Sequence, residues 1–197
     1  MTPDQRRQMI VEAALPLVAA GGSAVTTLQV ARAAGIGEAT IFRVFPTKDA
    51  LLDAVVAAVL RPDQALGDID AIPLDQPLAD RLAAAAAVLQ AHLDRMGRVL
   101  GALHASGHNR DGRRPPAAGP RAAAPTATRD ALARLFEPER HALRHPPARL
   151  AEVFIGLLLA RGRPLGGGGA SGEAAQLTVP QLVDLLLHGA LAEGRDR

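Results

Sequence analysis

The stretch that decides the fold is residues 26–36, which read Thr26-Thr27-Leu28-Gln29-Val30-Ala31-Arg32-Ala33-Ala34-Gly35-Ile36. Thr26 and Gln29 have the spacing of a capping box, in which two side chains satisfy the free N–H groups at a helix start. Gly35 can take the left-handed conformation that ends a helix. The stretch therefore predicts a helix of about two turns with both ends marked.

Two further short helices are expected directly after this one. Gly37 is a permissive cap for a helix over 38–45, which ends at Pro46. Thr47 can cap a helix over 48–60, which stops before Pro62. Two short helices joined by a turn with glycine form the helix-turn-helix unit, whose second helix lies in the DNA major groove.

Upstream, residues 3–20 predict a helix that opens with Pro3 and ends at Gly21-Gly22. Pro16 lies inside this helix and should bend it, because proline removes one backbone hydrogen bond. The apolar residues that recur there at helical spacing are Ile10, Ala13, Ala14, Leu17 and Val18.

Downstream, residues 61–77 are rich in Asp and Pro and are expected to form an acidic connection between two domains. A long helix is expected over 78–105, with one apolar stripe formed by Leu82, Ala86, Leu89, Leu93, Met96, Leu100 and Leu103. Shorter helices are expected over 128–145, where a break at Pro138 is an alternative, over 148–161 and from Thr178 to near Gly194. The segments 107–128 and 162–173 are expected to be a flexible loop and a mobile linker.

The last two of these helices, about 148–161 and 178–193, are apolar around nearly their whole circumference. A single core-facing stripe cannot account for this pattern in a chain of 197 residues. We expect both helices to be buried on two sides, by their own domain and by a second copy of the chain in a homodimer.

The composition favours an all-α protein. Hydrophobic residues make up 48% of the chain but aromatic residues only 2%, and alanine is the commonest residue. The absence of cysteine excludes disulfides, thiolate zinc sites and iron–sulfur clusters. No signal-peptide pattern and no apolar run of about 18 residues is present, so we expect a cytoplasmic protein without a membrane partner.

The charge of the whole chain says little about nucleic-acid binding. The sequence pI is about 10.2, whereas the formal net charge is only +2. Lys48 is the single lysine, and tyrosine and cysteine are absent, so almost nothing titrates between neutrality and pH 10. Any case for DNA binding must therefore come from local pattern.

Residues 5–55 resemble the N-terminal domain of TetR-family transcriptional regulators. The matching residues are Ala13-Ala14, Leu17, Thr26-Thr27, Val30-Ala31, Ala34-Gly35-Ile36, the run 39–45 (Ala-Thr-Ile-Phe-Arg-Val-Phe) and Lys48-Asp49-Ala50-Leu51. Beyond this region, only the helical layout and the final helix that starts at Thr178-x-Pro180 fit the family, whose C-terminal domains vary.

The resemblance implies that Thr26, Thr27 and Lys48 contact phosphates of the DNA backbone. It also implies that Glu38, Ala39, Thr40 and Arg43 lie on exposed faces of the recognition helix. Arg43 could read guanine, Glu38 could accept from cytosine or repel phosphate, and Ala39 or Thr40 could touch a thymine methyl group.

The chain departs from the family pattern at two of these positions. Phe42 stands where members usually carry tyrosine, so it can offer only ring-edge or methyl contacts. Gly37 stands where a serine commonly caps the recognition helix. Charges in residues 1–61 are nearly balanced, so we expect modest non-specific DNA affinity, and a dimeric binding module whose head has lost DNA affinity remains an alternative.

Three residues of the long helix, His92, Arg95 and Met96, are candidates for an effector pocket, although ordinary surface exposure is an equal alternative. The pairs His104/His108 and His141/His145 have the four-residue spacing of helical metal ligands, but their loop-like surroundings argue against a metal site. We find no catalytic motif, so we expect neither an enzyme nor a cofactor. The rival hypothesis is a helical metal- or ligand-binding protein without DNA activity.

Together these patterns predict an all-α chain with an N-terminal three-helix helix-turn-helix DNA-binding domain, residues 1–61. Residues 62–197 are expected to form a helical domain for effector binding and dimerisation. The expected function is that of a ligand-responsive regulator, most simply a repressor. It would bind palindromic double-stranded operator DNA as a homodimer and be released by an unknown small-molecule effector.

Overall fold

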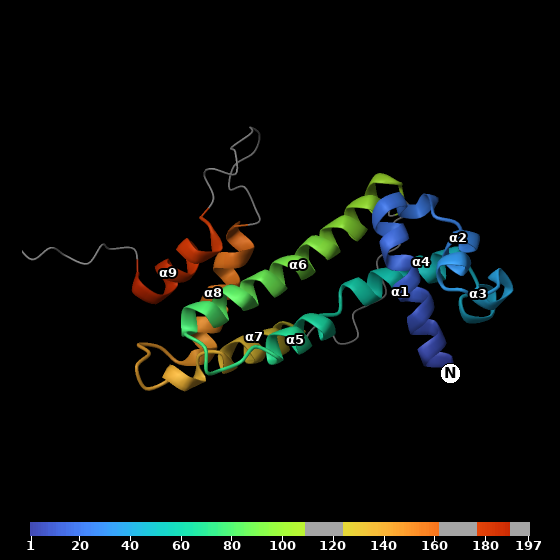
Figure 1. The fold of residues 1–197 in the computed structure, drawn as a ribbon. Helices are drawn as coiled ribbons and strands as arrows, with labels where there is room; N and C mark the ends of the chain where they lie inside the picture. The colour runs from blue at the N-terminus through green and yellow to red at the C-terminus, as the bar shows by residue number, and fades with distance from the viewer. Residues whose placement is uncertain (109–123, 162–176, 190–197) are drawn as a thin grey trace, which may run out of the picture. The chain divides into compact units, whose positions relative to one another are not determined.

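The structure is a computed structural model that describes residues 1–108, 124–161 and 177–189. Its described residues are helical, without a strand, as the composition predicts (Figure 1). They divide into two compact units, one containing residues 1–62 and the part of the long helix from His92 onward, the other containing 63–91 and the described residues after 123. No described helix is both long enough and apolar enough to cross a membrane.

The N-terminal unit contains α1 (Pro3–Gly21), the 3-10 turn η1 (Gly22–Ala24), α2 (Thr27–Ala33), α3 (Glu38–Val44), α4 (Lys48–Val59) and the second half of α6 (Leu78–Ala105). The expected helices over these residues are confirmed to within two residues at each end, and α1 continues through Pro16. Thr2, Thr26 and Thr47 cap α1, α2 and α4 through their side chains.

The core of the N-terminal unit is built from one apolar face of each helix. Its most deeply buried residues are Ile10, Ala14, Val18, Val30, Ala31, Ile41, Phe45, Leu51, Leu52, Val55, Val99 and Leu103. The last two come from α6, which thereby completes the core of a unit otherwise made from the first 62 residues.

The C-terminal unit contains α5 (Asp63–Asp70), the first half of α6, α7 (Ala124–Arg134), the 3-10 turn η3 (Glu137–Glu139), α8 (Pro147–Arg161) and α9 (Val179–His188). Its core contains Ile69, Leu82, Ala85, Ala86, Leu132, Leu135, Phe136, Ala151, Phe154, Leu182 and Val183. The side chain of Arg81 is also fully buried in this unit and pairs with Glu139.

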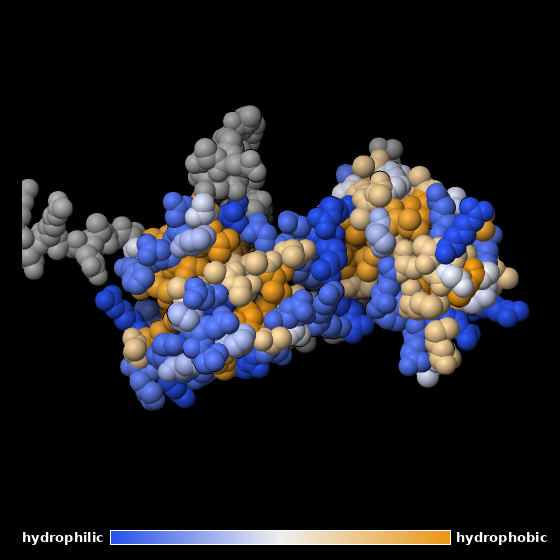
Figure 2. All heavy atoms as spheres, in the orientation of Figure 1, coloured by the Kyte–Doolittle hydropathy of each residue, from blue (hydrophilic) through white to orange (hydrophobic). Residues whose placement is uncertain are grey.

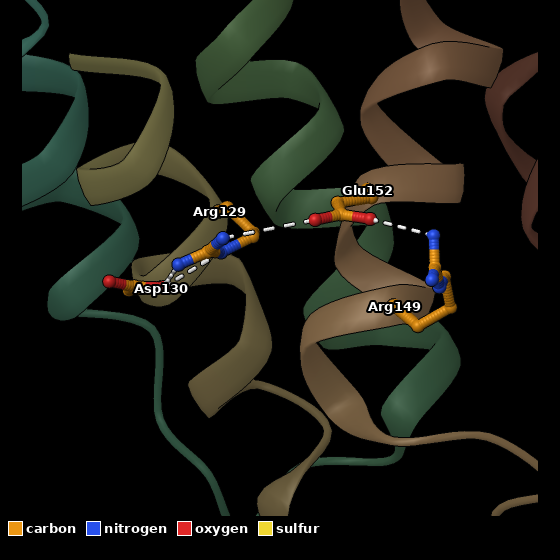
Figure 3. Close-up of polar contacts among 4 residues, drawn as sticks. All are labelled: Arg129, Asp130, Arg149 and Glu152. Carbon is orange, nitrogen blue, oxygen red and sulfur yellow. Dashed lines mark hydrogen bonds and ion pairs between the residues drawn. The ribbon is translucent and has the colours of Figure 1, made fainter. Parts of the chain in front are cut away.

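A small surface network links α7 to α8 in the C-terminal unit. The Glu152 carboxylate lies between two arginines, at 3.8 Å from Arg129 and 3.4 Å from Arg149 (Figure 3). Arg129 also pairs with its neighbour Asp130 at 2.7 Å, and these contacts raise the pKa of the guanidinium. All four side chains are at least partly exposed, so the network orders the surface more than it stabilises the fold.

Four expectations need correction. The stretch 61–77 is not only a connection, because Ala65 and Ile69 bury one face of α5. The helix expected over 128–145 is α7, which starts at Ala124 and ends at Arg134, since the chain turns into η3 at Pro138. The final helix ends at His188 with Gly189 as its cap, at φ +87°, and not near Gly194.

The fourth correction concerns the apolar stripe of α6. Leu93 is 38% exposed, whereas Val99, which lies off the expected stripe, is buried. The two halves of α6 pack in different units, so no single stripe serves the whole helix. The loop expected at 107–128 and the linker expected at 162–173 lie mostly or wholly outside the described residues.

Candidate nucleic-acid interface

The helix-turn-helix is formed by α2, a short turn and α3. Gly35 takes a left-handed conformation, at φ +66°, as expected for a helix stop. The chain then folds back because the amide of Ile36 donates to the carbonyl of Ala31 at 3.0 Å. Gly37, in extended conformation, begins α3, and no side chain caps that helix. The turn is thus fixed by backbone conformation and hydrogen bonds.

The second helix of the unit, α3, has one buried face and one open face. Ile41 is fully buried, and Phe45, directly after the helix, is 1% exposed. Ala39, Phe42 and Arg43 are exposed, Phe42 to 47%, and Thr40 is half-buried. A helix with this division can present side chains to a DNA groove while its other face stays in the core.

The structure brings Thr27 and Glu38 together. The Thr27 hydroxyl donates to the Glu38 carboxylate at 2.5 Å and so joins the first turn of α2 to the first residue of α3. Thr26 is occupied differently, because its hydroxyl caps α2 by accepting from the amide of Gln29 at 3.2 Å. Both threonines therefore fix the start of α2 or its contact with α3.

Lys48 holds the start of α4 against η1. Its Nζ donates to the carbonyl oxygen of Ser23 at 2.5 Å, and the side chain is half-buried. The amide of Ser23 donates to the Ser106 hydroxyl at 2.8 Å, just past the end of α6. Lys48, the only lysine of the chain, thus links α4 to η1 through this hydrogen bond.

Sequence reasoning did not single out Ser23 or Ser106, and it treated Gly22 only as part of a helix end. A Cβ atom on Gly22 would overlap the carbonyl oxygen of Ala102 and the hydroxyl of Ser106, and Gly22 also has a positive φ of +55°. The Gly21-Gly22 pair signalled a helix end, but nothing in the sequence indicates that α6 approaches it there. The close approach arises from packing between segments about 80 residues apart.

Arg7 is a second residue that sequence reasoning missed. Its guanidinium lies 4.4 Å from the ring centre of Phe45, the residue that follows α3. An exposed arginine over an aromatic face gains a modest cation–π attraction. This contact places a positive charge of α1 beside the end of the recognition helix.

The candidate effector residues lie in the second half of α6. His92 is half-buried, and its pKa is lowered first by burial and then by the positive charge of Arg95. Met96 packs against the core of the N-terminal unit. Arg95 lines a hollow of about 490 Å³ against α1, whereas His92 and Met96 do not line it.

The histidine pairs do not form ligand sets in the described part of the chain. His141 and His145 lie in the turn between η3 and α8, so the helical spacing assumed for them does not apply. His108 faces Asp53 at 3.9 Å. Among the described residues, no group of three His, Cys, Asp or Glu side chains could hold a metal ion.

Comparison with known proteins supports the assignment of the N-terminal unit. Residues 10–55 match the family model described as bacterial regulatory proteins, tetR family. A TetR-family transcriptional regulator from Streptomyces coelicolor is 23% identical, with a TM-score of 0.53, over 94% of this chain and 80% of the other.

Two further solved structures have the same fold. The TetR transcriptional regulator SCO0520 from Streptomyces coelicolor is 23% identical, with a TM-score of 0.52, over 93% of this chain and 97% of the other. A structure described as a TetR-family transcriptional regulator from Mesorhizobium loti is 16% identical, with a TM-score of 0.59, over 94% of this chain and 95% of the other. At these identities the likeness establishes the fold alone. Residues 10–55 thus match the tetR family of bacterial regulatory proteins, and the chain shares the helical fold of these solved structures.

Proposed function

We propose that this protein is a ligand-responsive repressor that binds a palindromic operator as a homodimer. The observation that carries the proposal is the division of α3 into a buried face and an open face with Ala39, Phe42 and Arg43 exposed. Residues 1–61 would bind DNA, and residues 62–197 would dimerise and carry the response to the effector. In a dimer, two recognition helices about 34–36 Å apart would fit successive turns of the major groove.

The side chains on the open face of α3 differ in what they can read. Arg43 has the donor pair that suits guanine, and Ala39 and Phe42 suit thymine methyl groups. Thr40, half-buried, can reach DNA only through its outer edge. Glu38 is held by Thr27, which supports a role in placing the start of α3 more than one in reading cytosine.

The phosphate contacts would come from the helix starts around the recognition helix. Thr26 and Thr27 stand at the N-terminus of α2, where backbone N–H groups and the helix dipole favour an anion. Lys48, at the first residue of α4, adds a positive charge while one of its N–H groups holds Ser23. Because the charges of residues 1–61 are nearly balanced, specific contacts should dominate binding.

Dimerisation would use α8 and α9. Val153 and Leu159 on α8 are 45% and 48% exposed, and Leu177, just before α9, is 47% exposed. Figure 2 shows apolar residues reaching the surface between hydrophilic ones in this unit. Large exposed apolar side chains on two neighbouring elements support an interface with a second copy, since a soluble monomer rarely leaves them uncovered.

The experiment that tests DNA binding is selection of bound fragments from random duplex DNA, followed by fluorescence anisotropy with the selected operator. We expect Arg43→Ala to weaken binding by about 1–3 kcal/mol, roughly 5- to 150-fold, because a bidentate contact to a base is lost. Arg144→Ala, an exposed arginine of the C-terminal unit, is the control with the same charge change. Equal affinities for the three proteins would contradict the proposed reading of DNA by α3.

A further inference from the structure

The hollow between α1 and the second half of α6 lies within the N-terminal unit. Its volume of about 490 Å³ is in the range of about 300–1,000 Å³ that small-molecule sites occupy. The α1 side consists of Leu15, Pro16, Ala19 and Ala20, and Val99 of α6 is the buried apolar residue of the other side. Most of the lining is therefore apolar.

The polar groups of this hollow are of one kind. Arg95 and Arg98 line it from α6, three residues apart and hence on one side of that helix. Guanidinium groups donate hydrogen bonds and accept none. Pro16 on the opposite side has no backbone N–H, and the other α1 side chains carry no polar atom. A ligand that fits must therefore offer acceptors to α6 and an apolar surface to α1.

The neighbouring titratable groups leave the hollow positive. The pKa of His92, one turn before Arg95, is lowered first by burial and then by the positive charge of Arg95. Four carboxylates stand on the same helices, Asp4 and Glu12 on α1 and Asp80 and Asp94 on α6, and all four are exposed. None of these four carboxylates lines the hollow, and the charged residues that line it are Arg95 and Arg98.

We propose that this hollow binds a small organic anion with an apolar body. The acid group would pair with Arg95 and Arg98, and the body would cover Leu15, Ala19 and Val99. The proposal names the chemical class of the effector and rests on the proposed function only for its consequence, release of DNA. The site lies on α1 and α6 of the unit that carries the recognition helix, so a ligand that binds one conformation of this unit more tightly would shift its DNA affinity.

Fluorescence titration with 8-anilinonaphthalene-1-sulfonate tests the proposal, because this probe joins an apolar body to an acid group. N-phenyl-1-naphthylamine has the same body without the sulfonate and should bind at least about tenfold more weakly, since it lacks the charge-assisted hydrogen bonds. Arg98→Gln should weaken binding of the sulfonate probe by about tenfold and leave the neutral probe unaffected. Arg144→Gln is the matched control and should change neither affinity.

A variant that fills the hollow tests whether the probe binds there. Ala20 is exposed, so Ala20→Phe can narrow the hollow without disturbing the core, and it should weaken both probes. Ala142→Phe, in an exposed turn of the C-terminal unit, is its control. Equal binding of the two probes, or equal affinities for Arg98→Gln and Arg144→Gln, would overturn the proposal. Sulfonate binding without release of operator DNA would leave the site intact and contradict its role as the effector site.

Discussion

The two units hold their helices together by different polar contacts. In the N-terminal unit, these contacts include helix caps, hydrogen bonds to backbone groups, such as that from Lys48 to the carbonyl of Ser23, and the half-buried side-chain contact from Thr27 to Glu38. In the C-terminal unit, a charged side chain, Arg81, is fully buried and pairs with Glu139 of η3. Within the described part of the chain, the Nε and Nη1 atoms of Arg81 and one oxygen of Glu139 have no hydrogen-bond partner.

The difference shows where each unit is sensitive to change. Hydrogen bonds to a backbone carbonyl or amide add order at small cost, because each partner is neutral or stays partly hydrated. A buried guanidinium has lost its water, and it is tolerated only while its carboxylate stays in place. We therefore expect the stability of the C-terminal unit to fall most when one charged side chain is removed. The stability of the N-terminal unit should fall most when a side chain is added where two segments are closely packed.

The largest effect is expected at the buried pair. Glu139→Ala leaves the Arg81 charge buried without its counter-charge and should lower the free energy of unfolding by about 3–5 kcal/mol. Arg81→Met should cost clearly less, because the side chain of Glu139 is 37% exposed and can be hydrated when released. Urea denaturation followed by circular dichroism measures both, and equal losses in the two variants would contradict this asymmetry.

The next effect concerns space in the N-terminal unit. Gly22→Ala combines a positive φ with overlap at Ala102 and Ser106, and should cost about 2–4 kcal/mol in unfolding free energy. Gly35→Ala is the matched control, because Gly35 has a positive φ but open space around it, and should cost about 1–2 kcal/mol. If both variants lowered the melting temperature equally, the expected steric effect of the close approach between Gly22 and α6 would be contradicted.

A smaller effect is expected at the contact between α2 and α3. Thr27→Val removes the hydroxyl that donates to Glu38 and should cost about 1 kcal/mol, the usual net value of a hydrogen bond. Thr27→Ser keeps the hydroxyl and should lose less stability. If Glu38 places the start of α3, DNA affinity should fall with Thr27→Val and recover with Thr27→Ser in the same anisotropy titration.

The smallest effect is the pH dependence contributed by His92. Its pKa in the folded protein lies below the ordinary value of 6.5, because burial and Arg95 disfavour the charged form. Below pH 6.5 the unfolded chain takes up the proton first, so stability should fall as the pH drops from 6.5 to the folded pKa. The difference between urea midpoints at pH 7.5 and pH 5.5 should therefore be smaller in His92→Gln than in the native chain. Identical differences would contradict this contribution.

Much of the N-terminal unit could be predicted from local sequence signals. The caps at Thr26 and Thr47 and the left-handed Gly35 act within a few residues of their own position, so their pattern alone indicates where helices start and stop. The buried face of α3 follows from the spacing of Ile41 and Phe45. For the same reason, the sequence could predict which candidate residues lie on the open face of α3.

The misses have a common cause in contacts over long distances in sequence. The segment around α5 is acidic and contains Gly67, so its propensity for helix is weak, and burial of Ala65 and Ile69 stabilises it. Val99 and Leu103 join the N-terminal core from a helix that starts in the other unit. The hydrogen bonds of Lys48 and Ser23 likewise depend on which segments meet.

The sequence by itself determined the all-helical class, most helix ends and the helix-turn-helix, because these depend on capping groups, glycine conformation and apolar spacing within single helices. Only the tertiary structure decided how α6 divides between two cores, why Gly22 must lack a side chain, and which residues line the hollow beside Arg95 and Arg98. Those features arise where segments far apart in the chain exclude water from each other, and no local pattern records the partner.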